Sequence, residues 1–246
     1  MISNLYIRSI KINKQYQEGS YVFQLPVVKN FKPIEFKSNV TFFIGENGCG
    51  KSTLLEAIAV CLGFNAEGGS KNFCFSTKET HSPLFEYLKI SKGIKTPKDG
   101  YFLRAESFYN VASQIDELDS IPAAAPPISN SYGGKSLHVQ SRGESFMSLV
   151  TNRFNGNGLY ILDEPEAALS PSRQLALLSL INELVNLNSQ LIIATHSPIL
   201  LAYPNADIYV INETGISLTP YKETEHYLLT KQFLNNPERM LDHLLD

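Results

Sequence analysis

The sequence predicts an α/β fold in which helices cover a mainly parallel sheet. Three short runs are almost wholly apolar, as strands buried on both faces should be, and they lie at residues 40–44, 159–162 and 190–195. A leucine-rich stretch at 172–187 has the spacing of an amphipathic helix and separates the last two runs. Strands that alternate with helices in this order form parallel sheets in layered folds.

The N-terminal part of the chain predicts antiparallel strands beside this core. Residues 5–12 alternate between apolar and polar side chains, and a second run at 21–25 also reads as a half-exposed strand. A short strand pattern follows at 34–37. Residues 63–100 are rich in Gly, Ser, Lys and Thr, with one short helical pattern at 83–88.

The middle of the chain predicts a small helical subdomain at about 107–150. Residues 101–105 form a return strand in this interpretation, and residues 108–118 have helical spacing. The prolines of 121–128 remove backbone donors and fix φ, so that segment is expected to be a surface loop. A second helix is expected at 145–154, where large apolar side chains recur on one face.

Length and composition fit one globular domain that spans residues 1–246. The hydrophobic fraction of 43% is ordinary for such a domain. A net charge of −3 argues against a generally basic nucleic-acid binder, although a local patch fits within that total. Arg8, Lys11 and Lys14 form a modest basic cluster, which we expect to be a solvated strand face. No stretch approaches the ~18 consecutive apolar residues of a membrane span, so we expect a cytoplasmic protein.

The cysteines indicate reduced thiols. Cys49, Cys61 and Cys74 are odd in number and lack a paired metal spacing, so neither a disulfide framework nor a zinc site is implied. Cys49 lies within a glycine-rich loop beside Lys51, where either redox control or simple filling of the loop is open.

Residues 45–52 match the phosphate-loop pattern G-x-x-x-x-G-K-[ST]. The loop follows the predicted strand 40–44 and precedes an apolar helix, which is the context that the pattern requires and which argues against a chance match. Its glycines let backbone N–H groups point at phosphate oxygens. Lys51 is expected to reach the β- and γ-phosphates of ATP, and Ser52 to ligate Mg²⁺. The expected nucleotide-binding residues are Gly45, Glu46, Asn47, Gly48, Cys49, Gly50, Lys51, Ser52 and Thr53.

Two acidic residues directly follow the buried run 159–162. This places Asp163 and Glu164 at the carboxyl edge of the sheet, where ligands of open α/β sheets bind. In this Walker B arrangement Asp163 holds Mg²⁺ and Glu164 orients or deprotonates the water that attacks the γ-phosphate. Thr195-His196-Ser197 ends the next strand, so His196 is a candidate sensor of the γ-phosphate, with a purely structural histidine as the alternative.

Taken together, these motifs resemble those of the ABC-type ATPases. Residues 140–145, which read Gln-Ser-Arg-Gly-Glu-Ser just before a helix, resemble the signature Leu-Ser-Gly-Gly-Gln or its variant ending in Glu. The resemblance implies that Ser141, Gly143 and Glu144 belong to a second half-site, with Ser141 and Gly143 touching the γ-phosphate bound by a partner subunit. The chain departs from the family signature at Gln140, where the family has Leu, and at Arg142, where it has Gly.

Within this superfamily the chain looks most like the RecF, SMC and overcoming-lysogenisation branch. The similarity is carried by residues 45–57 and by 163–171, where transporter subunits usually have Ser-Ala-Leu-Asp after the proline. Residues 101–108 also resemble a group of small bacterial predicted ATPases without assigned function. There Glu106 takes the place of the Q-loop glutamine, which implies a further ligand of Mg²⁺.

The expected function is a cytoplasmic ATPase that closes as a homodimer on two ATP molecules and drives a change in a partner, with DNA or a DNA-processing protein as candidates. Only 90 residues separate Lys51 from Ser141 (141 − 51), which leaves no room for long coiled-coil arms. The alternatives are the nucleotide-binding subunit of a membrane transporter and a non-hydrolysing ATP-dependent switch. Tyr21, Phe23 and Phe31 are candidates to stack on adenine. The tail after Pro220 has helical spacing and is expected either to dock on its own domain or to bind a partner.

Overall fold

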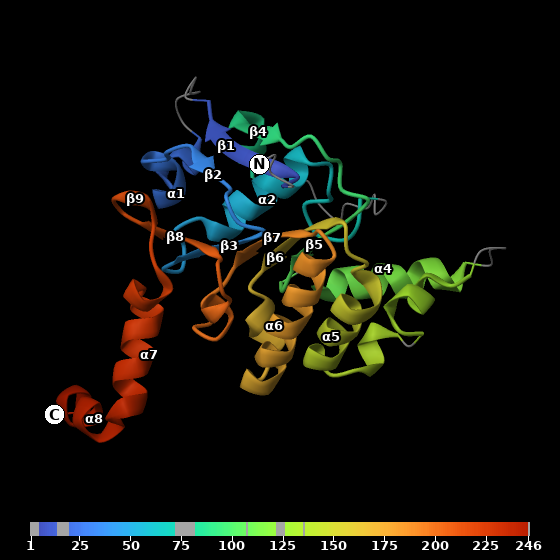
Figure 1. Ribbon diagram of the computed structural model, residues 1–246. Coiled ribbons are helices and arrows are strands. Elements are labelled where there is room, and N and C mark those ends of the chain that lie inside the picture. The colour runs from blue at the N-terminus through green and yellow to red at the C-terminus, as the bar shows by residue number, and fades with distance from the viewer. Residues whose placement is uncertain are drawn as a thin grey trace.

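A six-stranded sheet forms the centre of the protein (Figure 1). The computed structural model describes residues 5–13, 20–71, 82–106, 108–121, 126–134 and 136–245. Neighbouring strands are parallel except for the last, which is antiparallel to its neighbour. The strand order is β5 (Asp99–Arg104), β6 (Gly158–Asp163), β7 (Gln190–Ala194), β3 (Val40–Gly45), β8 (Asp207–Asn212) and β9 (Gly215–Leu218).

A smaller antiparallel sheet lies on one side of the central sheet. Its strands are β2 (Ile34–Glu35), β1 (Ile7–Ile12) and β4 (Leu88–Lys92), with β1 in the middle. Helix α2 (Lys51–Cys61) lies between the two sheets, and its apolar side chains share one core cluster with β1 and with Phe43 of β3 (Figure 1). The short helices α1 (Pro26–Lys29) and α3 (Leu84–Tyr87) belong to this layer.

The opposite face of the central sheet is covered by three longer helices. These are α4 (Phe108–Ser120), α5 (Arg142–Arg153) and α6 (Pro171–Asn186), which Figure 1 shows together below the sheet. Side chains alternate across a strand, so Phe42 and Ile44 of β3 enter the core cluster of these helices while Phe43 faces α2. The sequence prediction of a layered P-loop fold with a mainly parallel core and antiparallel N-terminal strands is confirmed. The region expected to be a helical subdomain contains α4 and most of α5.

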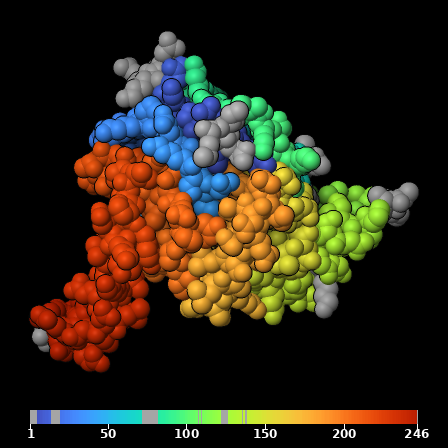
Figure 2. Space-filling view, in the orientation of Figure 1, coloured from blue at the N-terminus to red at the C-terminus, as the bar shows by residue number. Residues whose placement is uncertain are grey.

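The last two helices form an arm that leaves the body of the protein. Helix α7 (Glu225–Asn235) begins beside the sheet, and α8 (Pro237–Leu245) lies beyond it (Figures 1 and 2). Neither helix has a buried residue. The large exposed apolar side chains on this C-terminal arm are Leu228, Leu229, Phe233, Leu234, Leu241, Leu244 and Leu245. Docking of the tail on its own domain, one of the two expected outcomes, is observed only at its start, where Tyr221 donates to Pro198 O and His226 contacts His196.

One local prediction is wrong, one is confirmed in a shorter form, and one pair of strands was not predicted. Residues 21–24 form a 3-10 turn rather than a strand, because Pro26 starts α1 and the buried side chains Val22, Val27 and Val28 do not alternate. The helical pattern at 83–88 ends after four residues, and β4 follows it. The hairpin of β8 and β9 was not predicted. Residues 122–125 of the predicted loop, Lys14 and Cys74 lie outside the described residues.

Candidate nucleotide and catalytic site

The carboxyl ends of three neighbouring strands bring distant segments together at one edge of the sheet. Strand β7 pairs with β3 on one side and β6 on the other, so Ala194 lies in register with both Phe43 and Asp163. Because all three strands are parallel, the residues that follow them lie at the same edge. This edge therefore carries the phosphate loop after β3, the two acids at the end of β6 and His196 after β7.

The phosphate loop closes around its own lysine. Gly50 begins α2 with a φ of 97°, and a Cβ there would lie 2.5 Å from Val27 Cγ1, so the position requires glycine. Lys51 is 4% exposed, and its ammonium donates to the backbone oxygens of Gly45 and Glu46, each at 2.9 Å. Phosphate oxygens are better acceptors for an ammonium than these carbonyls. A bound polyphosphate would thus take the place of the loop carbonyls as the hydrogen-bond acceptor of Lys51.

Ser52 and Asp163 form a pair of oxygen ligands at the start of α2. The Ser52 hydroxyl donates to Asp163 Oδ1 at 3.1 Å, and Asp163 is 5% exposed. Burial raises the pKa of Asp163 to about 6, against the opposing effects of the Ser52 hydrogen bond and the Arg104 cation.

This pair fits Mg²⁺ bound together with a nucleotide. Mg²⁺ in such sites takes one or two protein oxygens and completes its shell with phosphate oxygens and water. The described residues contain no group of three or more His, Cys, Asp or Glu side chains that could hold a metal by themselves. A hydroxyl and a carboxylate beside the phosphate loop are therefore the ligands that the chain offers, and phosphates must supply the rest.

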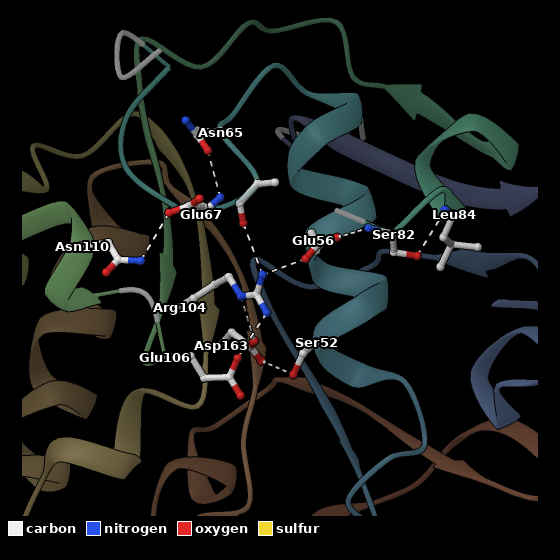
Figure 3. A network of polar contacts seen from close by, with 11 residues as sticks. Ser52, Glu56, Asn65, Glu67, Ser82, Leu84, Arg104, Glu106, Asn110 and Asp163 are labelled. Carbon is white, nitrogen blue, oxygen red and sulfur yellow. Dashed lines mark hydrogen bonds and ion pairs between the residues drawn. The ribbon is translucent and has the colours of Figure 1, made fainter. Parts of the chain in front are cut away.

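Arg104, at the end of β5, connects this metal-ligand pair to α2. Figure 3 shows its guanidinium between Glu56 and Asp163, with Nη1 2.7 Å from Glu56 Oε2 and Nε 3.9 Å from Asp163 Oδ2. The other oxygen of Glu56 accepts the Ser82 N–H at 2.7 Å. Glu106 has an 86% exposed side chain and lies 3.4 Å from Arg104 Nη2. The predicted Q-loop residue is thus held near Asp163 through Arg104 (Figure 3).

Glu164 takes up an unusual backbone conformation directly after Asp163. Its φ is 51°, a left-handed value that is uncommon for a residue other than glycine, and its N–H donates to Ala194 O at 2.9 Å. Oε1 of Glu164 lies 3.9 Å from Nε2 of His196. The two expected catalytic side chains are therefore neighbours, and both belong to the sheet edge that carries Lys51.

His196 is held from both sides. Its backbone N–H donates to Glu166 Oε1, and its Nδ1 lies 3.4 Å from Nε2 of His226 on α7. Nε2 of His196 is buried and has no hydrogen-bond partner among the described residues. Burial lowers the pKa of His196, the Lys51 charge lowers it further, and Glu164 acts in the opposite direction. His226 was not predicted, because no sequence pattern connects it to a residue 30 positions earlier.

A pocket of about 750 Å³ lies in front of the phosphate loop. Its lining combines that loop with the end of β8, the His196 ring and the first turn of α7, including Glu225 and His226. Thus the start of the C-terminal arm forms one wall of the candidate nucleotide pocket. None of the three candidate adenine-stacking residues lines it: Tyr21 is 58% exposed, Phe23 packs edge-on against Tyr87, and Phe31 is in the core.

The signature-like residues lie apart from this pocket. Ser141 caps α5 in a reciprocal capping box with Glu144, whose carboxylate also lies 3.4 Å from Arg173. Within the described part of the chain, no hydrogen bond or ion pair joins Ser141 or Glu144 to the phosphate loop. Gly143 is buried, and a Cβ there would lie 2.4 Å from Arg173 Nη1 and 2.6 Å from Ala168 O. Packing within the chain therefore already requires glycine at 143.

Two family models match the sequence. One is described as an AAA domain and matches residues 19–110, and the other as an AAA ATPase domain and matches residues 143–201. The first range contains the phosphate loop and Arg104, and the second contains Asp163, Glu164 and His196. No curated protein matches the chain.

Solved structures with similar architecture include transporter ATPases and an SMC head. A metal-chelate type ABC transporter in an inward-facing conformation is 16% identical, with 93% of this chain and 88% of that chain covered and a TM-score of 0.52. CbiO1 from Clostridium perfringens, part of the ABC transporter complex CbiONQ, is 20% identical, with 98% and 99% covered and a TM-score of 0.49. The SMC head domain from Thermotoga maritima is 16% identical, with 88% and 99% covered and a TM-score of 0.41.

The first of these similarities shows a shared fold, and the family models identify an ATPase. The predicted resemblance to ABC-type ATPases is thus confirmed at the level of fold and enzyme class. Across the described residues, no helix is long and apolar enough to span a bilayer.

Proposed function

We propose that this chain, an ATPase with the ABC-type fold, works as an ATP-dependent homodimer whose closing and opening drives a change in a bound partner. The observation that supports the proposal is that the motifs lie in two separate places on the chain. One chain gathers Lys51, Asp163, Glu164 and His196 at one sheet edge, while the exposed N-terminus of α5, with Ser141 at its cap, contacts none of them. A second copy is the source of a helix N-terminus that completes the site around the γ-phosphate.

The proposed chemistry is in-line attack of water on the γ-phosphate. Lys51 leaves its carbonyl partners and neutralises charge on the β- and γ-phosphates, together with the N–H groups of the loop. Glu164 orients the attacking water and accepts its proton. His196 donates from Nε2 to a γ-phosphate oxygen. Ser52 and Asp163 would hold Mg²⁺, which would supply further neutralisation of phosphate charge.

The shared site is tested with Glu164→Gln, which keeps the shape of the side chain and removes the base. Its turnover is expected to fall at least about 100-fold, the usual lower contribution of a general base. With saturating ATP and Mg²⁺ the variant should sediment as a dimer, and adding Ser141→Arg should return it to a monomer. Ser217→Arg, on the exposed edge strand β9, is the matched control. A Glu164→Gln protein that stays monomeric with ATP bound contradicts the shared site.

A basic face on the small sheet favours DNA as the partner. The face consists of Arg8, Lys11 and Lys89, all exposed and without an ion pair among the described residues. Lys11 and Lys89 lie directly opposite each other on adjacent strands. Like charges in such pairs repel, and a bound polyanion relieves this repulsion. The sequence-based expectation of a solvated strand face included only the β1 side of this surface.

The DNA branch is tested by the steady-state ATPase rate with and without double-stranded DNA, with Glu164→Gln as the blank. We expect stimulation that falls with added salt and that is lost in Lys11→Glu/Lys89→Glu. Lys222→Glu, an exposed lysine outside the basic face, should retain the stimulation. If DNA does not change the rate, the assignment as an ATPase stands and DNA is rejected as the partner. Co-purification with a membrane protein would point instead to the transporter alternative.

A further inference from the structure

His226 reaches the candidate sensor histidine from the start of the C-terminal arm. Its Nε2 lies 3.4 Å from Nδ1 of His196, and the two ring centroids are 5.6 Å apart. Both rings line the pocket in front of the phosphate loop. The contact is made by the ring nitrogen of His196 that faces away from Glu164, so it leaves the Nε2 side of His196 free.

The first turn of α7 is fixed to the loop that carries His196. The Tyr221 hydroxyl donates to Pro198 O at 2.9 Å, two residues beyond His196. Thr224, the N-cap of α7, is 1% exposed, donates to Tyr221 O at 2.7 Å and accepts the Tyr227 N–H at 3.3 Å. This anchoring determines the position of His226, whereas the rest of the arm is exposed. The pairing of the two histidines is thus a property of the domain itself.

The electrostatic surroundings favour the neutral form of both rings. Burial is the main cause that lowers the pKa of His196 and of His226. The Lys51 charge contributes to both, and His196 also lowers the pKa of His226. Glu164 acts in the opposite direction on His196, and Glu225 and Glu166 do so on His226. A neutral imidazole has one N–H and one acceptor nitrogen. A hydrogen bond between the rings therefore determines which nitrogen of His196 carries the proton.

Phosphate oxygens fix the direction that this hydrogen bond must take. Nε2 of His196 is buried without a partner among the described residues and lies 3.9 Å from Glu164 Oε1, on the side where the γ-phosphate and the attacking water are expected. An ionised phosphate oxygen only accepts, so Nε2 must be the protonated nitrogen of neutral His196. Its Nδ1 is then an acceptor, and the donor that faces it is Nε2 of His226.

We propose that His226 is a positioning residue for ATP hydrolysis, donating from Nε2 to Nδ1 of His196 and so holding the tautomer whose Nε2–H donates to the γ-phosphate. This inference rests on the proposed function, in which His196 contacts that phosphate. His226 itself acts through His196 and touches no reacting atom. The second histidine thus makes the start of the C-terminal arm a functional part of the nucleotide site.

The kinetic test compares His226→Leu with His226→Gln. Loss of the partner that orients a functional histidine typically costs about 10- to 100-fold, so we expect His226→Leu to lower kcat by about that factor. KM for ATP should stay within about twofold, because the interaction acts on the transition state rather than on ground-state binding. The glutamine amide can also donate to Nδ1, so His226→Gln should restore most of kcat. His243→Leu, at an exposed histidine on α8, is the matched control and should match wild type.

Two further measurements distinguish a positioning role for His226 from a purely structural one. Nitrogen-15 NMR of labelled histidines should find His196 protonated at Nε2 in wild type and a mixture of tautomers in His226→Leu. If His226→Leu hydrolyses ATP at the wild-type rate, or if the glutamine and leucine variants lose kcat equally, the positioning role is refuted. The ATPase rate of Glu164→Gln is measured in parallel. If this variant hydrolyses ATP as fast as wild type, the proposed hydrolysis mechanism is overturned, and with it this inference.

Discussion

Replacing Arg104 with methionine tests whether the network in Figure 3 stabilises the domain. The substitution keeps most of the aliphatic stem and removes the cation that lies 2.7 Å from Glu56 Oε2. The side chain of Glu56 is 9% exposed, and its remaining described partner is the Ser82 N–H. Removing one member of a buried ion pair typically costs about 3–5 kcal/mol. Because Ser82 still donates to the carboxylate, we expect the lower end, about 3 kcal/mol.

The partner substitution should cost less, which makes the prediction specific. In Glu56→Gln, Arg104 keeps Glu106 and Asp163 nearby and the glutamine oxygen can still accept a hydrogen bond, so we expect about 1 kcal/mol. The double variant contains no uncompensated carboxylate at position 56. Its cost should therefore lie below the sum of the single costs by about 1–2 kcal/mol, as is usual for contacting residues.

Urea denaturation of the metal-free protein measures these differences. With a slope of about 3 kcal/mol per molar, the upper range for small proteins, a loss of 3 kcal/mol moves the midpoint by about 1 M. Fluorescence and circular dichroism must give coincident transitions for the two-state treatment to hold. Equal costs for Arg104→Met and Glu56→Gln, together with strict additivity in the double variant, would refute the reasoning.

Three other substitutions probe the site and its surroundings. Lys51→Ala should weaken ATP binding at least about 100-fold in calorimetric titration, because charge-assisted hydrogen bonds to phosphate are lost. Gly143→Ala places a methyl group against the backbone oxygen of Ala168 as well as the movable Arg173 side chain, and overpacking of this kind costs about 1–3 kcal/mol, to be read as a lower Tm. For Asp163, the native pKa of about 6 lies above the ordinary value, so the native state binds the proton more tightly than the unfolded state. In EDTA, protonation of Asp163 therefore contributes about 3 kcal/mol to the free energy of unfolding below pH ~4, and this contribution is lost by pH ~6. Asp163→Asn should lack it when urea titrations are repeated across that pH range. Parallel pH profiles of stability for the two proteins would contradict this prediction.

The strands and helices with strong patterns were predictable from sequence. β3, β6 and β7 are buried on both faces, so their residues form continuous apolar runs that the chain reveals directly. The run at 21–25 is apolar as well, yet it forms a turn, because composition alone does not distinguish a short strand from a turn that packs Val22 inward. Short elements such as β4 and β9 have too few residues to show a period.

In the candidate site as well, residues within local sequence motifs were predictable, and contacts between distant segments were not. Lys51, Asp163, Glu164 and His196 were predicted because each follows a strand within a local motif, and the parallel sheet brings such positions to one edge. The contacts of Arg104 and His226 were not predicted. Their partners Glu56 and His196 lie 48 and 30 residues away in the sequence, and contacts over such distances leave no local pattern. The orientation of these side chains depends on which strands and helices become neighbours in the folded sheet.

The position of β3 in the sheet has a consequence for biosynthesis. Both of its neighbours, β7 and β8, come from residues 190–212, so the strand that leads into the phosphate loop has no pairing partner until most of the chain exists. At about 5–20 residues per second, translation leaves β3 unpaired for roughly 7–30 s after it is made. The candidate nucleotide site is incomplete during this interval, because Asp163 and His196 have not yet joined the sheet. Because β3 is apolar on both faces and stays unpaired during this time, we expect it to be the segment of the nascent chain that most needs protection from aggregation.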